Sequence, residues 1–165
     1  MSDLKVSWDE YNRKIEELAI TVSDYEFNQI VCVAKGGLRV GDILSRIYNV
    51  PLAILSAESY DGETRTQGEL IFSRDLAMTR PGLGSKVLLV DDLADSVTTL
   101  IKTVEWLHHY YGFYTEEMKT AVLWTKGCSE FTPDYQCEYL ADSPWIHQPF
   151  GKYESMTIED LKNNG

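Results

Sequence analysis

The chain has 165 residues, of which 44% are hydrophobic, so it is long and apolar enough for one folded domain with a sizeable core. Its 15 Lys and Arg against 26 Asp and Glu give a formal net charge of −11, which favours neither duplex nucleic acid nor anionic membranes. No apolar run reaches the length of a transmembrane helix, and residues 1–5 lack the apolar segment of a signal peptide. Cys32, Cys128 and Cys137 show no metal-ligand spacing and are typical of reduced thiols. We therefore expect a single cytoplasmic domain over residues 1–165.

The chain opens with a helix and then a strand. Ser7 and Glu10 have the spacing of a capping box, and apolar residues recur at helical intervals from Tyr11 to Val22. The apolar run 30–34 predicts a buried strand that ends in a glycine turn. Residues 38–48 are predicted to form the next helix, closed by Asn49-Val50-Pro51.

The middle of the chain contains two further strands and a polar segment between them. Residues 51–57 and 86–90 predict buried strands, and the Thr- and Gly-rich segment 58–69 predicts a mobile loop. Residues 70–72 can pair as a hairpin arm after that loop.

The last part continues the alternation of strands and helices. We predict a helix over 97–111, strands over 120–124 and 135–140, and a short helix within 155–163. Strands that alternate with helices imply an α/β fold with a doubly wound, mostly parallel sheet and flanking helices. The loops at the carboxyl ends of its strands converge on one side, where such folds bind ligands.

Two adjacent carboxylates follow the strand 86–90. Asp91 and Asp92 repel each other unless a cation or hydrogen-bond donors compensate, and paired carboxylates suit Mg²⁺ or sugar hydroxyls. Asp95 and the hydroxyl-rich stretch 96–99 then lead into a helix, whose free N–H groups suit a phosphate. The alternative is an acidic turn with an ordinary N-cap, so this loop points to a phosphorylated sugar only in combination with the double aspartate.

A second loop also joins a strand to a helix. In Lys35-Gly36-Gly37-Leu38 the glycines let the backbone approach a phosphate, and Lys35 or Arg39 adds positive charge. A glycine pair is by itself more typical of a plain turn.

These segments together resemble the type I phosphoribosyltransferases, in particular their 6-oxopurine branch, over roughly residues 28–150. The stretch 87–100 resembles the phosphoribosyl-pyrophosphate motif, and Lys35-Gly36-Gly37-Leu38 resembles the pyrophosphate loop. Ser59-Tyr60-Asp61 resembles the start of the mobile loop, and Lys126-Gly127 stands where the branch has its purine-reading lysine. The stretch 145–150, Trp-Ile-His-Gln-Pro-Phe, resembles the segment of the hood. We therefore expect a small hood near 142–165, to which the N-terminal helix is a candidate addition.

The resemblance implies roles for the residues that match. Asp91 and Asp92 would hold the ribose hydroxyls, directly or through Mg²⁺, and Asp95 would handle the proton at purine N7. Contacts to phosphate would come from the two loops, through Lys35, Gly36, Ser96, Val97, Thr98 and Thr99. Lys126 would donate to the 6-oxo group, Trp145 would stack on the base, and Ile146 would offer backbone contacts.

The chain departs from the family pattern at a few positions. Val97 stands where most members have glycine, and a β-branched residue is stiff there. Arg65 is close enough to replace an arginine of the mobile loop that has no clean equivalent, and Lys35 replaces an arginine of the pyrophosphate loop. The N-terminal helix and the acidic tail have no counterpart that the resemblance identifies.

The resemblance implies a Mg²⁺-dependent purine salvage enzyme. It would join hypoxanthine, guanine or xanthine to phosphoribosyl pyrophosphate, release pyrophosphate, and form a homodimer or homotetramer. Val97 supports a second hypothesis, in which the protein is a non-enzymatic regulator that binds a nucleotide or phosphoribosyl pyrophosphate on the same fold. A transferase for another base is a third reading, against which Lys126 and the segment 145–150 argue.

Overall fold

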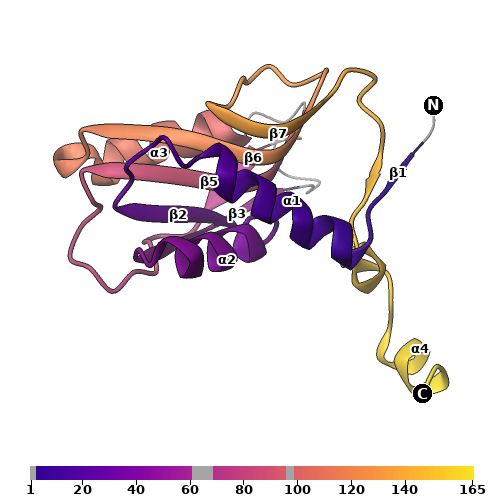
Figure 1. The fold of residues 1–165 in the computed structure, drawn as a ribbon. Coiled ribbons are helices and arrows are strands. Elements are labelled where there is room, and N and C mark those ends of the chain that lie inside the picture. The colour runs from indigo at the N-terminus through magenta and orange to yellow at the C-terminus, as the bar shows by residue number, and fades with distance from the viewer. Residues whose placement is uncertain (1–2, 61–68, 96–98) are drawn as a thin grey trace.

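The central sheet has six strands in the order β4-β3-β2-β5-β6-β7 (Figure 1). The computed structural model describes residues 3–60, 69–95 and 99–165. Neighbouring strands are parallel except for β3 and β4, which pair antiparallel. This confirms the predicted doubly wound, mostly parallel sheet. The strands are β2 (Gln29–Ala34), β3 (Leu52–Tyr60), β4 (Glu69–Phe72), β5 (Lys86–Ala94), β6 (Glu117–Lys126) and β7 (Tyr135–Leu140).

Helices cover both faces of the sheet because its strands carry apolar residues on both faces. On β5, Leu88 and Val90 pack in the core beneath α1 (Trp8–Thr21) and α2 (Leu38–Tyr48). Val87 and Leu89 of the same strand pack on the opposite side with α3 (Thr99–Tyr111), which ends in the short 3-10 helix η1 (Gly112–Tyr114). A strand buried on both faces reads as a continuous apolar run, which is how the sequence shows it.

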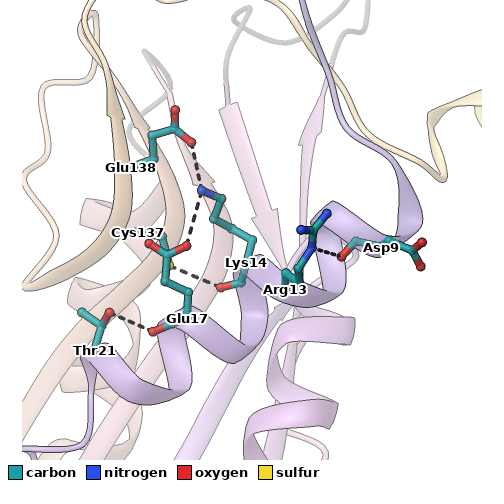
Figure 2. Close-up of polar contacts among 7 residues, drawn as sticks. All are labelled: Asp9, Arg13, Lys14, Glu17, Thr21, Cys137 and Glu138. Atoms are coloured by element: carbon teal, nitrogen blue, oxygen red, sulfur yellow. Dashed lines mark hydrogen bonds and ion pairs between the residues drawn. The ribbon is translucent and has the colours of Figure 1, made fainter.

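The first helix is held at its start and along its exposed edge. Ser7 and Glu10 form the predicted capping box, with reciprocal hydrogen bonds of 3.2 and 2.7 Å. Farther along α1, Lys14 Nζ lies 3.0 Å from Glu138 Oε2 on β7 and 3.5 Å from Glu17 Oε2 (Figure 2). The Sγ of Cys137 on β7 also approaches the Lys14 carbonyl oxygen at 3.4 Å (Figure 2). These contacts fix α1 over the edge of the sheet.

The hood joins the two ends of the chain. Strand β1 (Leu4–Lys5) pairs in parallel with β8 (Ile146–His147), and the 3-10 helix η2 (Gly151–Glu154) follows. The short helix α4 (Ile158–Asn163) lies away from the sheet (Figure 1) and is exposed throughout. The N-terminal strand β1 therefore lies beside the segment that was predicted to form the hood.

Three predicted strands extend farther than expected, and one of them is β6, which spans Glu117–Lys126 and not 120–124 alone. Strand β5 continues to Ala94, because Asp91, Leu93 and Ala94 keep their pairing with β6, so the aspartates do not begin a loop. Strand β3 continues to Tyr60, because its end pairs with β4. Ser59 and Tyr60 therefore lie in a strand, whereas we expected them in a loop. Within the described residues no helix is both long and apolar enough to cross a membrane.

Candidate active site

A cleft of about 1160 Å³ opens where the carboxyl ends of β2, β5 and β6 meet the hood. It is lined by seven of the site residues that the sequence predicted, together with further residues of α1, α2 and the hood. Those seven are Lys35, Gly36, Asp92, Asp95, Lys126, Trp145 and Ile146. Parallel strands place their carboxyl ends at one edge, which explains why residues far apart in the sequence converge here.

The glycine turn after β2 allows a close backbone approach. A Cβ atom on Gly36 would lie 2.5 Å from Asp92 Oδ1, and one on Gly37 would lie 2.7 Å from the Val33 carbonyl oxygen. Both contacts are shorter than real Cβ atoms tolerate, so neither position accepts a side chain without a shift of its neighbours. The peptide bond between Ala34 and Lys35, at the start of this turn, is cis. The turn therefore brings the bare backbone at Gly36 against the Asp92 carboxylate, and the neighbouring Lys35 is exposed.

Asp91 and Asp92 are both held in a buried environment that disfavours their charges. Burial raises the pKa of Asp91 well above its usual range, and the neighbouring charge of Asp92 raises it further. Burial also raises the pKa of Asp92. Asp91 Oδ1 accepts a hydrogen bond from the Asp92 N–H at 2.8 Å, and Asp92 Oδ2 accepts one from Gln148 Nε2 at 3.2 Å. Charge of opposite sign or additional donors would stabilise this pair.

The two aspartates line different spaces. Asp92 lines the large cleft, whereas Asp91 lines a small cavity of about 50 Å³ with Thr99 and Ser129. Asp92 is therefore the better placed of the two for direct contact with a ligand in the cleft. Asp91 supports it from beneath through the backbone hydrogen bond described above.

Lys126 brings a positive charge into the cleft from the end of β6. Its side chain is 8% exposed, and its Nζ lies 3.0 Å from Asp95 Oδ2. The same Nζ lies 5.7 Å from the centre of the Trp145 ring, and Cys128 Sγ approaches Asp95 Oδ1 at 3.4 Å. An ammonium, a carboxylate and an exposed indole face thus meet at one end of the cleft, a set that can donate to, accept from and stack on a planar base.

The hood leaves backbone groups of Ile146 available at the same end. Leu4 N–H donates to the Trp145 carbonyl oxygen at 2.9 Å, and Val6 N–H donates to that of His147 at 3.0 Å. Since successive residues of a strand direct their backbone groups to opposite sides, the N–H and C=O of Ile146 face away from β1. Their position fits the backbone contacts that the sequence predicted for Ile146.

Several cleft residues escaped the sequence reasoning. Tyr11 and Gln148 line the cleft beside Asp92, and Lys152 and Glu154 line it from η2. Tyr11 carries no local signal, because its place in the apolar repeat of α1 makes it look like an ordinary core residue. Gln148 lies in the stretch that resembles the hood segment, but the resemblance implies no role for it.

The remaining predicted residues lie at the edge of the site or outside the described chain. Thr99 begins α3 and lines the small cavity with Asp91. Ser59 pairs with Leu70 and Tyr60 pairs with Glu69 in the hairpin. Arg65 and the stretch 96–98, which comprises Ser96, Val97 and Thr98, lie outside the described residues.

Comparison with known proteins identifies the family. A family model described as "Phosphoribosyl transferase domain" matches residues 7–155, so α1 does have a family counterpart, contrary to our expectation. The xanthine-guanine phosphoribosyltransferase of Idiomarina loihiensis is 31% identical over 148 residues, which cover 88% of this chain and 84% of that protein. That of Chromohalobacter salexigens is 33% identical over 114 residues, or 67% of each chain.

Solved structures agree with this assignment. A purine phosphoribosyltransferase from Pyrococcus horikoshii superposes with a TM-score of 0.71 at 27% identity, covering 91% of this chain and 94% of that one. A xanthine-guanine-hypoxanthine phosphoribosyltransferase from Helicobacter pylori shares the fold, with a TM-score of 0.76 at 22% identity and coverage of 99% and 98%. With the match of the family model over most of its length, the chain belongs to the phosphoribosyl transferase family, on the branch that includes the xanthine-guanine phosphoribosyltransferases.

Proposed function

We propose that this protein is a purine salvage enzyme that joins hypoxanthine, guanine or xanthine to phosphoribosyl pyrophosphate and releases pyrophosphate. The observation that carries the proposal is the Lys126–Asp95 ion pair against the face of Trp145, in one cleft with Asp92 and the Lys35-Gly36 turn. One end of the cleft suits a 6-oxopurine, and the other suits a pentose phosphate. The names of the curated relatives support the same substrate class.

The residues divide the reaction between the two ends. Cleavage at C1 of the ribose develops positive charge on the sugar and negative charge on the departing pyrophosphate. Lys35 and the backbone at Gly36 are assigned to the pyrophosphate, where preorganised donors stabilise developing negative charge. On the sequence resemblance, 96–99 holds the 5′-phosphate. No protein nucleophile is required, because the base attacks C1 directly.

Asp95 and Lys126 are assigned to the purine. Lys126 donates to the 6-oxo group, and the carboxylate of Asp95 accepts or shares the proton at N7 as N9 attacks. In the ligand-free chain these two groups pair with each other at 3.0 Å, so each is already oriented toward the same space. Trp145 covers the base, and the Ile146 backbone reaches its edge. Positioning both substrates in line supplies much of the remaining acceleration.

Mg²⁺ is the cofactor that the acidic residues fit. Asp92 and Asp91 supply hard oxygen donors, and burial of both raises their pKa values, so a divalent cation nearby would favour the charged carboxylates. The described residues include no cluster of three metal-ligating side chains, which suits an ion that takes its remaining ligands from substrate oxygens and water. An ion held there would supply positive charge against the negative charge of the leaving pyrophosphate.

The test is a nucleotide-synthesis assay with each of the three purines, phosphoribosyl pyrophosphate and Mg²⁺. We expect the nucleoside monophosphate and pyrophosphate to appear in equal amounts with at least one purine. No product with any of them contradicts the proposal. Calorimetric binding of ligand without turnover would support the regulatory binder that Val97 suggests, and activity with a different base alone would support the third reading.

The partners expected of such an enzyme are its small substrates and copies of itself. We propose a homodimer or homotetramer, which light scattering of the purified protein tests directly. Exposed aromatic side chains at the end of α3 and in η1, namely Tyr110, Phe113 and Tyr114, are available for such contacts. All three cysteines are free thiols, which fits the reducing cytoplasm that the sequence predicts.

A further inference from the structure

Tyr11 is a fully buried residue whose hydroxyl group has no hydrogen-bond partner within the described part of the chain. Its ring packs at 5.7 Å from Phe150 and at 6.5 Å from Trp124, measured between ring centres. The residue lines the cleft from α1. Buried hydroxyl groups in folded proteins are normally paired, so an unpaired one at the wall of a binding cleft calls for a partner that arrives with the ligand.

A second unpaired polar atom among the described residues belongs to Gln148, which lines the same cleft. Gln148 Nε2 donates to Asp92 Oδ2, whereas its Oε1 is buried and has no partner among the described residues. Because a carboxylate only accepts, this hydrogen bond orients the amide with its nitrogen toward Asp92 and leaves the oxygen as a free acceptor. Burial raises the pKa of Tyr11 most, and the charge of Asp92 raises it further.

The two atoms have complementary chemistry. Burial and the nearby Asp92 raise the pKa of Tyr11, so its hydroxyl keeps its proton and can donate. Gln148 Oε1 can only accept. A sugar hydroxyl can accept from one and donate to the other, whereas an ionised phosphate oxygen has no proton to give.

We propose that Tyr11 and Gln148 form, with Asp92, a subsite for one hydroxyl group of the ribose ring. The proposal rests on the proposed function for the presence of a pentose in the cleft, and it adds two binding residues from opposite ends of the chain. Tyr11 donates to the ribose oxygen, and Gln148 accepts from the same hydroxyl while it orients the Asp92 carboxylate.

The test compares Tyr11→Phe with the unchanged protein in calorimetric binding of GMP, 2′-deoxy-GMP and 3′-deoxy-GMP, with Mg²⁺ present. Phenylalanine keeps the packed ring and removes only the unpaired hydroxyl. We expect the variant to bind GMP about 3- to 10-fold more weakly, as the loss of one hydrogen bond predicts. Its affinity for one of the two deoxy analogues should equal that of the unchanged protein, because that analogue lacks the partner.

Tyr25→Phe is the matched control. Tyr25 is also buried, but its hydroxyl donates to the carbonyl oxygens of Val87 and Glu117 at 3.1 and 3.2 Å and does not line the cleft. We expect Tyr25→Phe to lower the stability in urea and leave GMP affinity unchanged. Tyr11→Phe should leave stability unchanged or raise it, because its hydroxyl is unsatisfied in the ligand-free protein.

The outcomes separate this proposal from the proposed function. The subsite is contradicted if Tyr11→Phe and the unchanged protein bind GMP with equal affinity. It is also contradicted if the variant loses the same affinity for GMP and for both analogues, and both conclusions hold even if the protein is catalytically active. Absence of GMP binding by the unchanged protein also overturns it. If Tyr11→Phe loses affinity for GMP and for one analogue only, and the unchanged protein has no catalytic activity, the subsite is supported and only the proposed reaction is contradicted.

Discussion

Lys126 shows how tertiary surroundings turn an unremarkable residue into a functional candidate. At the residue scale a lysine after a strand is typical of a solvated end, and only the family resemblance singled it out. In the structure its side chain is 8% exposed and pairs with Asp95. Burial of a charge is unfavourable unless it is paired, so the pair is retained either for stability or for a ligand.

Lys126→Met separates these two roles. We expect kcat/KM for the purine to fall on the order of 100-fold, since removal of one partner from a buried charge pair costs about 3 kcal/mol in binding. Lys14→Met is the matched control, because Lys14 also pairs with a carboxylate at 3.0 Å, that of Glu138 on β7 (Figure 2), and is not among the residues that line the cleft. That variant should change stability by less than about 1 kcal/mol and leave kcat/KM unchanged. Equal losses of activity in both variants would contradict the assignment.

Asp91 makes stability depend on pH in a predictable direction. Its pKa is raised in the folded state, so above the ordinary pKa of aspartate the folded chain binds this proton more tightly than the unfolded chain does. Stability therefore falls as pH rises toward the folded-state pKa, and below about pH 4 the difference vanishes. The same sign applies to Asp92, whose pKa is also raised.

Asp91→Asn tests this directly, because asparagine keeps an oxygen for the Asp92 N–H and never ionises. We expect the variant to be more stable than the unchanged protein at pH 8 and nearly equal to it at pH 4, measured by urea unfolding without ligands. A variant that is less stable at pH 8 would show that the charge of Asp91 is favoured in the fold.

At the scale of elements, the strands exceeded their predicted ends where a neighbour continued the pairing. The apolar run at 86–90 is visible in the sequence, but Asp91 to Ala94 remain extended because β6 lies beside them. In the same way, β4 keeps Ser59 and Tyr60 in β3. Local composition predicts loops at both places, since polar residues are typical of loops, and only cross-strand hydrogen bonds overrule it.

The pairing of β1 with β8 predicts a proline experiment. Leu4 donates its N–H to the Trp145 carbonyl oxygen, so Leu4→Pro removes a hydrogen bond that holds the hood. Lys5→Pro is the control, because the N–H of the intervening residue faces away from β8. We expect Leu4→Pro to raise KM for the purine several-fold and to leave KM for phosphoribosyl pyrophosphate close to that of the unchanged protein. The activity of Lys5→Pro should stay close to that of the unchanged protein. A rise in both KM values would mean that β1 supports the whole fold instead of the hood.

At the scale of the whole molecule, the site draws on both ends of the chain and on three strands between them. Ligand binding should therefore stabilise the molecule as a unit. A ligand present at 100 times its Kd raises the free energy of unfolding by about 2.7 kcal/mol. We expect this increase with phosphoribosyl pyrophosphate and Mg²⁺, measured by chemical unfolding.

Asp92→Asn should abolish most of that stabilisation at the same ligand concentration. Asp75→Asn is the control, because Asp75 is exposed and its carboxylate pairs on the surface with Arg74 at 3.8 Å. Stabilisation of Asp92→Asn equal to that of the unchanged protein would contradict the assignment of Asp92 to the ligand.

The sequence alone determined the order of elements, the parallel sheet and the principal ligand loops. Strands, helices and glycine turns follow from residue periodicity over short stretches, and the carboxyl-end rule then places Lys35, Asp92 and Lys126 at one edge. Only the tertiary structure decided that β1 pairs with β8, that β5 runs on to Ala94, and that the Tyr11 hydroxyl at the cleft has no partner among the described residues. These features depend on contacts between residues distant in sequence, which no local pattern records.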